Sequence, residues 1–474
     1  GFAYPGTVAS FRAPLRLLVA ALLLALIAAP AARAEFDEDE AKFPNEAYPA
    51  AFRKRVNLAI DRGAHWLLSQ QGPAGDWTTH YSSSYPMGPS ALATLALLKA
   101  GVPGDHPRIE KAFTHLRTLP MQKTYSVSIL LMALDARYGP ATDTFAEEQV
   151  DRYGHRKERT PCEEHIDKAD LAWMKEGVKF LVEHQNDGVW RYPAGRFDLS
   201  NTQYALLGLK AASRCGVEIP RRVWMDALEF HLDHQEDDGE DVKVRVNEVR
   251  GDYRIEWTEP AKARGFSYAA KGSPTGSMTT AGLAGLLICQ SELWQRRSFT
   301  GKLRQRTRDA IRDGFAWMQR NYAVHRNPGR GHGHHYYYLY GLERAGILAH
   351  ARFIGEHDWY EDGAWLLLDA QSRNGSWRRG HLVDTCFAML FLKRATFRDV
   401  NFGEPSDHGP LSMIAGFPAV RPGFRVCARC GTVQKAKAET PEHAYSCSSR
   451  KPGAKQEMED CLYLYREFQS EALR

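Results

Sequence analysis

Three turns of this chain share a glutamine, a glycine and a tryptophan at nearly constant spacing. The three sets are Gln71/Gly75/Trp77, Gln185/Gly188/Trp190 and Gln371/Gly375/Trp377. Each set follows one segment with helical apolar periodicity and precedes another, which predicts a helix, a turn and a second helix. Self-similarity of this kind indicates stacked helical hairpins, because one hairpin alone cannot bury its apolar face.

The two helices of each predicted hairpin differ in composition. The helix before the turn is aromatic and carries charged residues on one side, as in residues 178–185 and 228–235. The helix after the turn is apolar nearly all round, as in residues 90–101 and 277–289. A helix with one charged side lies at a surface, whereas a helix that is apolar all round is enclosed. We therefore expect an outer helix before each turn and an inner helix after it.

Six such hairpins are predicted, and they give an all-α fold. They cover residues 53–101, 106–138, 167–216, 220–293, 303–350 and 358–394. Successive antiparallel pairs with one buried member are expected to close into an (α/α)6 toroid over residues 51–396. Residues 147–167 form a charged loop in this interpretation. Residues 237–271 contain the alternating segments VKVRV and YRIEW, which predict a short β insertion.

The N-terminus has the pattern of an export signal. Arg12 and Arg16 precede an apolar run at residues 17–29, which is too short to cross ~30 Å of hydrocarbon comfortably. Residues 32–34 then offer an AxA cleavage site. We expect a signal peptide over residues 1–34, an N-terminal extension over residues 35–50, and an exported mature protein without a transmembrane helix.

The charge balance argues against one class of partner. The full chain has a formal net charge of +5, and removal of the three arginines in residues 1–34 lowers this charge to +2. Nucleic-acid-binding proteins usually carry a strongly basic surface. No nucleic-acid partner is therefore expected, and the overall composition is that of an ordinary globular protein.

The turns resemble the QxxxGxW repeats of the terpenoid cyclase and protein prenyltransferase superfamily, which includes the squalene-hopene cyclases. The turns at Gln71 and Gln371 fit that form, and the turn at Gln185 is one residue shorter. A fourth turn keeps only part of the pattern, namely Gln235, Gly265, Phe266 and Tyr268. The resemblance covers residues 52–396 and implies a toroid whose central cavity holds an isoprenoid or another apolar ligand. The glutamines and tryptophans themselves are expected to join hairpins and to have no catalytic role.

The inner helices of a toroid run parallel, so their six N-termini meet at one mouth of the cavity. Their free N–H groups and dipoles suit an anion or a polarised group. The aligned first-turn residues are Ser90, Ser126, Asn201, Met278, His334 and Asp384, followed by Ala91, Val127, Thr202, Thr279, His335 and Thr385. N-capping is one explanation for the serines, threonines, asparagine and aspartate in these columns. The alternative is a functional cluster of Asp384, His334, Asn201 and Cys386, because capping does not require histidine or cysteine.

Asp384 is the predicted catalytic residue, with His334 as its partner. Through the prenyltransferase branch, the resemblance implies that an Asp-x-Cys pair, here Asp384 and Cys386, binds a catalytic zinc together with a later histidine. No inner helix follows to supply that histidine, so His334 or His335 would replace it. Through the cyclase branch, the resemblance implies a protonating acid in a DxDDTA motif. This chain has LVDT at residues 382–385, so both earlier acids are missing and standard cyclase activity is not expected.

Aromatic and basic residues near the same mouth are predicted to contact the ligand. His335, Tyr336 and Tyr337 open an inner helix, and their ring faces suit the apolar or cationic character of a bound isoprenoid. Arg191 and Tyr192, which follow the second tryptophan, are further candidates. The alternative is structural, with the aromatic rings filling the annulus and the histidines hydrogen-bonded at its rim.

The eight cysteines fall into two groups. Cys162, Cys215, Cys289 and Cys386 are scattered, and Cys215 and Cys289 lie in inner-helix segments, where buried thiols are expected. After a linker at residues 397–423, residues 424–474 are predicted to form a zinc-ribbon-like module. Its candidate zinc ligands are Cys427, Cys430, Cys447 and Cys461, with His443 as an alternative. Export favours a second possibility, two disulfides, and a third is that neither forms.

Two function classes remain open. The first is an exported cyclase-like protein that binds or transforms an isoprenoid or another apolar ligand in its central cavity. The second is a non-catalytic scaffold that engages envelope or extracellular protein partners. A third interpretation, a carbohydrate-active toroid, rests on fold alone and is disfavoured by the QxxxGxW turns. An open apolar cavity that reaches Asp384 would favour the first class, and a centre filled by side chains would favour the second.

Overall fold

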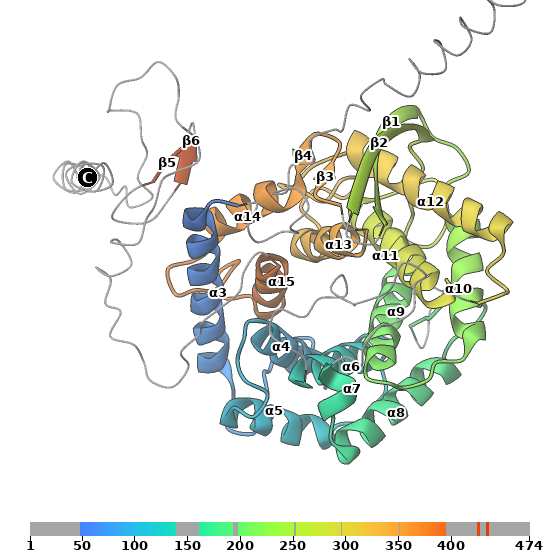
Figure 1. Cartoon of the computed structure of the whole chain (residues 1–474). Helices are drawn as coiled ribbons and strands as arrows, with labels where there is room; N and C mark the ends of the chain where they lie inside the picture. The colour runs from blue at the N-terminus through green and yellow to red at the C-terminus, as the bar shows by residue number, and fades with distance from the viewer. Residues whose placement is uncertain are drawn as a thin grey trace, which may run out of the picture. The chain divides into compact units, whose positions relative to one another are not determined.

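The computed structural model describes residues 48–138, 161–192, 198–250, 253–294, 296–349 and 351–394, together with two short strands in the tail. Within these residues it contains 13 helices and three two-stranded antiparallel sheets (Figure 1). The predicted all-α class is therefore confirmed. None of the described helices combines the length and the apolar character needed to cross a membrane. The predicted signal peptide and N-terminal extension lie outside the described residues, apart from the last residues of the extension.

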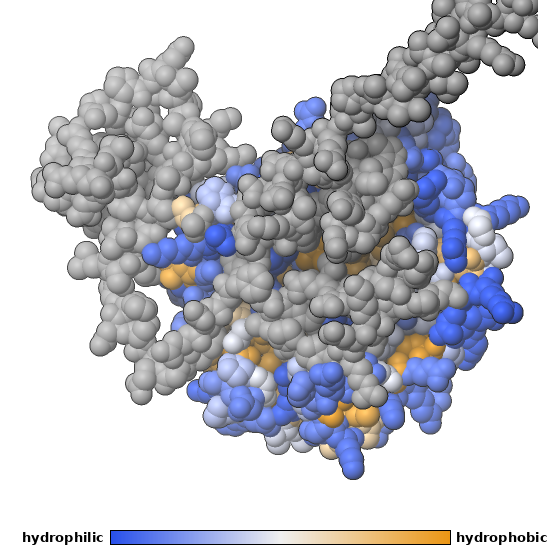
Figure 2. Space-filling view, in the orientation of Figure 1, coloured by the Kyte–Doolittle hydropathy of each residue, from blue (hydrophilic) through white to orange (hydrophobic). Residues whose placement is uncertain are grey.

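The first helix of each predicted hairpin buries one stripe of its surface. These outer helices are α3 (Ala50–Gln70), α5 (Pro107–Arg117), α8 (Lys168–Glu183), α10 (Arg221–His234), α12 (Gly301–Arg320) and α14 (Trp359–Ala370). In α5 the buried residues are Ile109, Ala112, Phe113 and Leu116, which recur at the spacing of one helical face. Figure 2 shows hydrophilic side chains at the periphery of the molecule and hydrophobic ones inside them.

The second helix of each hairpin is buried almost all round. These inner helices are α4 (Gly88–Lys99), α6 (Thr124–Tyr138), α9 (Leu199–Arg214), α11 (Gly276–Leu293), α13 (His335–Leu348) and α15 (Leu382–Lys393). Every residue of α4 from Pro89 to Leu98 is buried. Close packing of these helices needs small residues: a Cβ at Gly208 in α9 would lie 2.7 Å from the Cα of Ser128 in α6.

The inner helices contact one another in chain order, and the last returns to the first. The contacts run from α4 to α6, α9, α11, α13 and α15, and α15 also packs against α4 (Figure 1). The outer helices α14 and α3 meet as well. There the Gln371 side-chain amide donates a 2.8 Å hydrogen bond to the Ala59 carbonyl, and Arg62 donates one of 3.0 Å to the Ser372 carbonyl. The two ends of the helical region are therefore joined directly.

The three tryptophans make the same hydrogen bonds in their three turns. Each indole N–H donates to a carbonyl of the preceding outer helix at 2.7–2.8 Å. These pairs are Trp77 with Leu67, Trp190 with Leu181 and Trp377 with Leu367. Each tryptophan backbone N–H donates in turn to an inner-helix hydroxyl, at Ser90, Thr202 and Thr385 respectively. Each tryptophan thus ties the outer helix of its hairpin to the inner one.

The glutamines connect each hairpin to the next. The side-chain amides of Gln71, Gln185 and Gln371 donate to backbone carbonyls at Arg108, Val223 and Ala59, each at or next to the following outer helix. The glycine of each set has a positive φ and lies against that neighbouring helix. At Gly375, for example, a Cβ would lie 2.2 Å from the Arg62 carbonyl oxygen. The shared residues of the three turns are therefore explained by packing alone.

The fourth turn keeps part of this pattern and carries the expected β insertion. Gln235 donates to the carbonyls of Arg264 and Ala310, and the Phe266 backbone N–H donates to the Thr279 hydroxyl. Between them lie the antiparallel strands β1 (Asp241–Arg250) and β2 (Tyr253–Lys262), in the segment where alternation predicted them.

The structure contains one short helix and two short pairs of β-strands that the sequence analysis did not predict. The short helix α7 (Pro161–His165) lies in the segment expected to be only a charged loop, most of which is outside the described residues. The hairpin of β3 (Phe353–Ile354) and β4 (His357–Asp358) connects α13 to α14. In the tail, β5 (Phe424–Val426) pairs with β6 (Val433–Lys435).

Candidate functional site

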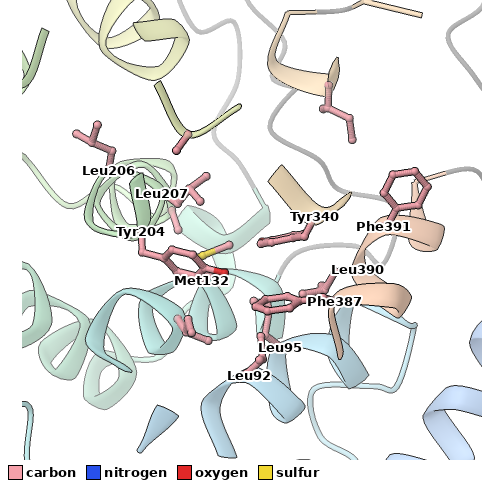
Figure 3. Packing of buried hydrophobic residues seen from close by; sticks show 14 of the residues in the cluster. Leu92, Leu95, Met132, Tyr204, Leu206, Leu207, Tyr340, Phe387, Leu390 and Phe391 are labelled. Atoms are coloured by element: carbon pink, nitrogen blue, oxygen red, sulfur yellow. The ribbon is translucent and has the colours of Figure 1, made fainter. Parts of the chain in front are cut away.

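Aromatic side chains from four inner helices meet between those helices. The ring centroids of Tyr125 and Tyr204 are 4.5 Å apart, and those of Tyr204 and Tyr337 are 6.1 Å apart. Phe387 lies 5.9 Å from Tyr337 and 5.4 Å from Tyr340. Figure 3 shows Tyr204, Tyr340 and Phe387 converging from α9, α13 and α15. Because α9 and α13 are separated by α11 in the order of contacts, these rings occupy the space that the inner helices surround.

The phenol groups in this cluster stay uncharged. Burial raises the pKa of the Tyr204, Tyr337 and Tyr340 hydroxyls above the ordinary value. The Tyr337 hydroxyl donates a 3.1 Å hydrogen bond to the side-chain oxygen of Gln203. The cluster is therefore a packed aromatic layer in which the Tyr337 hydroxyl is hydrogen-bonded, whereas the buried Tyr204 hydroxyl has no hydrogen-bond partner among the described residues. Tyr337, predicted to contact ligand, is part of it.

Asp384 lies in the first turn of α15 and is held by two basic side chains. Its side chain is largely buried, and its Oδ2 atom accepts a 2.8 Å hydrogen bond from Arg378 Nη1. The Nδ1 atom of His381 lies 3.1 Å from the same oxygen and 3.3 Å from the Asp384 backbone nitrogen. It donates to the carboxylate when it carries a proton, and it accepts from the backbone N–H when it does not. The histidine in contact with Asp384 is therefore His381, and no hydrogen bond or ion pair joins Asp384 to the predicted partner His334 within the described residues. The sequence feature that could have identified His381 is its position, because it immediately precedes the inner helix as its N-cap.

The start of α13 places its histidines in different surroundings. His334 is the exposed N-cap of the helix and has a left-handed backbone with φ of 56°. The His335 ring contacts the Val324 carbonyl through Nε2 at 2.7 Å, and burial lowers the pKa of this imidazole. Burial also raises the pKa of Tyr336 to about 12, and the Asp384 charge adds to this shift. Within the described ranges no hydrogen bond or ion pair joins Asp384, His334 and Asn201.

Asn201 is tied to an acid that sequence reasoning missed. Asp198 is the N-cap of α9, and its carboxylate accepts hydrogen bonds from the Asn201 backbone at 2.8 Å and from the Asn201 side chain at 2.6 Å. The caps of α9, α11 and α15 are Asp198, Thr275 and His381. The N-capping explanation was therefore wrong for Asn201 and Asp384, which lie three residues inside their helices.

We give the name tyrosine rim to four tyrosines whose phenols feel the Asp198 charge, of which Tyr268 is the exposed one: Tyr125, Tyr192, Tyr268 and Tyr337. Tyr125 and Tyr192 stack with centroids 6.3 Å apart. Burial raises the pKa of both phenols, and the negative charge of Asp198 adds to each shift. Tyr268 is 48% exposed, and its carbonyl accepts a hydrogen bond from the Leu199 backbone N–H. Arg191, next to Tyr192, is exposed.

A separate pocket of about 240 Å³ lies beside His381. Its lining side chains come from the end of α3, from the loop after Trp77 and from the start of α15. They include Trp66, Gln70, His80, Tyr81 and His381. We call this the Tyr81 pocket. The chain segments that form it are about 300 residues apart in sequence, so periodicity could not reveal it.

The cysteines of the helical region differ from their prediction. Cys215 is bonded to Cys162 in a disulfide and caps the end of α9, so its expected state as a buried thiol was wrong. Cys289 and Cys386 are buried free cysteines, and burial raises the pKa of both thiols.

The predicted zinc ligands of the tail lie outside the described residues. They are Cys427, Cys430, Cys447, Cys461 and the alternative His443. Cys427 and Cys430 fall between the paired strands β5 and β6. The described residues include one group of three potential metal ligands, Asp135, Cys162 and Cys215, and two of these are joined in the disulfide.

Comparison with known proteins adds no relative. No protein-family model, no curated protein and no solved structure matches this chain. The likeness to the terpenoid cyclase and prenyltransferase superfamily therefore remains a resemblance of the turns.

Proposed function

We propose that this chain is an exported binding protein built as an (α/α)6 toroid, and that a protein partner docks on its tyrosine rim. The order of contacts supports the toroid, because α15 packs against α4 and α14 packs against α3. Hydrogen bonds from Gln371 and Arg62 join the same two outer helices. A closed arrangement of six hairpins accounts for both sets of contacts.

The aromatic layer between the inner helices carries the functional proposal. Tyr204, Tyr340 and Phe387 occupy the space in which a cyclase-like protein would hold its ligand. An isoprenoid chain would have to displace these rings, which pack against one another and against the surrounding apolar side chains. The rings that occupy this part of the space favour the scaffold class over the ligand-transforming class.

The tyrosine rim supports recognition at the surface. Tyrosine is enriched at protein interfaces because its ring buries apolar area while its hydroxyl remains a hydrogen-bond donor and acceptor. Tyr268 is almost half exposed, its side chain is hydrogen-bonded to Tyr192, and Tyr192 stacks on Tyr125. Rigid aromatic side chains lose little conformational entropy on binding.

Export is part of the proposal and has one structural support. The disulfide between Cys162 and Cys215 joins α7 to the end of α9, across 53 residues of sequence. Disulfides persist mainly in oxidising compartments such as the periplasm and the extracellular space. This agrees with the secretory pattern of residues 1–34.

The tail is proposed to bind one structural zinc ion through Cys427, Cys430, Cys447 and Cys461. The pairing of β5 with β6 supports this, because Cys427 and Cys430 lie in the stretch of sequence between these two strands. Metal analysis of the purified chain under reducing conditions should give one zinc per chain. If the protein instead contains no zinc and its tail cysteines are oxidised, the zinc proposal is wrong and the four cysteines form two disulfides.

Two measurements test the binding proposal. First, the purified chain is incubated with envelope lipid and analysed by native mass spectrometry, and we expect no stoichiometric lipid adduct. Second, a photo-crosslinking amino acid at position 268 should capture a discrete protein in living cells, whereas the same probe at Trp294 should not. An isoprenoid that co-purifies at one per chain, or equal crosslinking at the two positions, would exclude the rim as the functional surface.

A further inference from the structure

The Tyr81 pocket offers aromatic faces and polar edges together. Three rings form one corner of it. The centroids of His80 and Tyr81 are 3.8 Å apart, and His381 lies 6.1 Å from His80 and 6.5 Å from Tyr81. The Tyr81 and His381 rings are nearly perpendicular, at 87°. The indole of Trp66 provides a further aromatic surface in the pocket.

The polar edges of these rings are open to a ligand. The Nδ1 edge of His381 faces Asp384, and within the described ranges the Nε2 edge of this ring has no hydrogen-bond partner. The same is true of the Tyr81 hydroxyl and of both ring nitrogens of His80. Gln70, Thr78 and Thr79 add one amide and two hydroxyl groups to the lining. The pocket can therefore exchange several water contacts for ligand hydrogen bonds.

The lining lacks fixed charge, which narrows the class of ligand. None of its eleven residues is Asp, Glu, Lys or Arg. The nearby Arg378 is bound to Asp384 and does not line the pocket. A phosphate or sulfate ligand would require cations that the lining does not supply. In the described part of the chain, the three-residue metal-ligand group lies elsewhere, at Asp135, Cys162 and Cys215.

The backbone keeps one wall of the pocket free of side chains. Arg378, Arg379 and Gly380 all have left-handed conformations, with φ of 47°, 55° and 85°. A Cβ at Gly380 would lie 3.5 Å from the Trp66 ring, so the glycine leaves that indole face uncovered. Consecutive left-handed residues are costly for L-amino acids other than glycine and persist only where the surrounding structure enforces them.

A volume of about 240 Å³ and this lining suit one particular kind of molecule. The space is many times the ~10–15 Å³ that one water needs on the same measure, and it admits a single six-membered sugar ring. The C–H face of such a ring packs on an aromatic face, while its hydroxyl groups need donors and acceptors around the edge. We infer that the Tyr81 pocket binds a neutral saccharide, with one pyranose ring against Tyr81 or Trp66 and its hydroxyl groups hydrogen-bonded to the two histidines. This inference goes beyond the proposed function, because the pocket and the tyrosine rim share no residue.

The test is binding of the purified full chain to an array of neutral, uronate-containing and sulfated glycans. We expect retention of neutral glycans, followed by saturable binding of the best of them in calorimetry. Tyr81→Ala and His80→Ala should each weaken that binding at least tenfold. Both residues are exposed, so neither change should affect folding.

The matched control is Trp294→Ala, which removes another exposed aromatic residue that lies outside the pocket. Its affinity for the glycan should stay within twofold of the parent chain. Absence of any bound neutral glycan would overturn the inference. So would retention of acidic glycans only, or an affinity that neither Tyr81→Ala nor His80→Ala changes. Loss of crosslinking at position 268 would leave the glycan result untouched, so the two proposals fail separately.

Discussion

The two ends of the inner helices are built from different side chains. At the amino-terminal ends the tyrosine rim and the Tyr81 pocket present aromatic rings, and the two acids there, Asp198 and Asp384, are occupied by local partners. At the carboxyl-terminal ends charged side chains are packed inside the molecule. Ion pairs there are Arg214 with Asp135, Lys210 with Glu292 and Arg344 with Glu343. Cations near helix C-termini also offset the partial negative charge of the helix dipoles.

The carboxyl-terminal ends of the inner helices leave little empty space between them, whereas the amino-terminal ends leave a larger pocket. We call these the closed end and the open end. The charged residues surround a cavity of about 20 Å³, which is room for about one water. The pocket at the opposite end is about 240 Å³ and is lined by partly exposed aromatic side chains. Buried charges are costly to separate, whereas exposed rings are inexpensive to replace. We therefore expect the carboxyl-terminal end to determine stability and the amino-terminal end to determine recognition.

The largest difference in stability between the two ends is expected when one charge is removed from the carboxyl-terminal end. Glu343 is almost fully buried, pairs with Arg344 at 2.9 Å, and feels the positive charges of Arg394 and Lys393. Glu343→Ala should lower the free energy of unfolding by ~3–5 kcal/mol, because it leaves a buried cation without its partner. The matched change at the open end, Tyr268→Ala, should alter it by less than ~0.5 kcal/mol. Equal losses in urea unfolding would contradict the division.

Lowering the pH should affect the free energy of unfolding in opposite directions through a buried histidine, His231, and a buried carboxyl group, Glu343. Burial lowers the pKa of His231 from 6.5 to about 4, so its contribution is complete above pH 6.5 and is lost as pH falls toward 4. That loss amounts to about 3 kcal/mol. Burial raises the pKa of Glu343, because the charged carboxylate is poorly solvated inside the protein. Protonation of Glu343 at low pH therefore removes this unfavourable burial of charge and stabilises the folded state. Unfolding free energies measured between pH 7.5 and 4 should therefore decrease overall. An increase on acidification would show that the carboxylates dominate.

The helical hairpins were predictable because their signals are local. Apolar periodicity and the Gln, Gly and Trp of each turn lie within single hairpins, and six predicted pairs correspond to the six observed pairs of long helices. Gln371 shows the limit of this reasoning. Its own turn was visible in the sequence, but its hydrogen bond reaches Ala59, and only the contact of α14 with α3 makes that partner available.

The site was less predictable because it depends on contacts that spacing does not encode. Asp384 was identified correctly as a first-turn acid, yet the aligned column paired it with His334 on another helix instead of with His381 three residues away. Cys215 was assigned to the inner helix, although it lies just past the helix end, where it can reach Cys162. The Tyr81 pocket needs three segments brought together by the whole fold.

Helix α13 carries both environments and permits a sharper comparison within one element. Its first residue, His335, is half-buried with a lowered pKa, and its later residue Glu343 has a raised pKa. Acidification from pH 7.5 to 5.5 should therefore reduce hydrogen-exchange protection at the start of α13 and spare its end. Protection factors are corrected for intrinsic exchange at each pH. His335→Gln should remove the difference, and a uniform change along α13 would contradict the assignment of separate environments.

The smallest expected effect on stability is at Asp384, where the proposed role is positional. Its ion pair with Arg378 involves a side chain that is 65% exposed, so solvent screens most of the interaction. Asp384→Asn should change the free energy of unfolding by less than ~1 kcal/mol, because asparagine has nearly the same size and can still accept the Arg378 hydrogen bond. Neutral-glycan affinity should nevertheless fall several-fold, since the Oδ2 atom of Asp384 fixes the Nδ1 edge of His381. Arg378→Gln keeps that histidine contact and should preserve affinity. If both variants bind the glycan as tightly as the parent chain does, the Asp384 carboxylate does not position His381. Its only role would then be its interaction with the start of the helix.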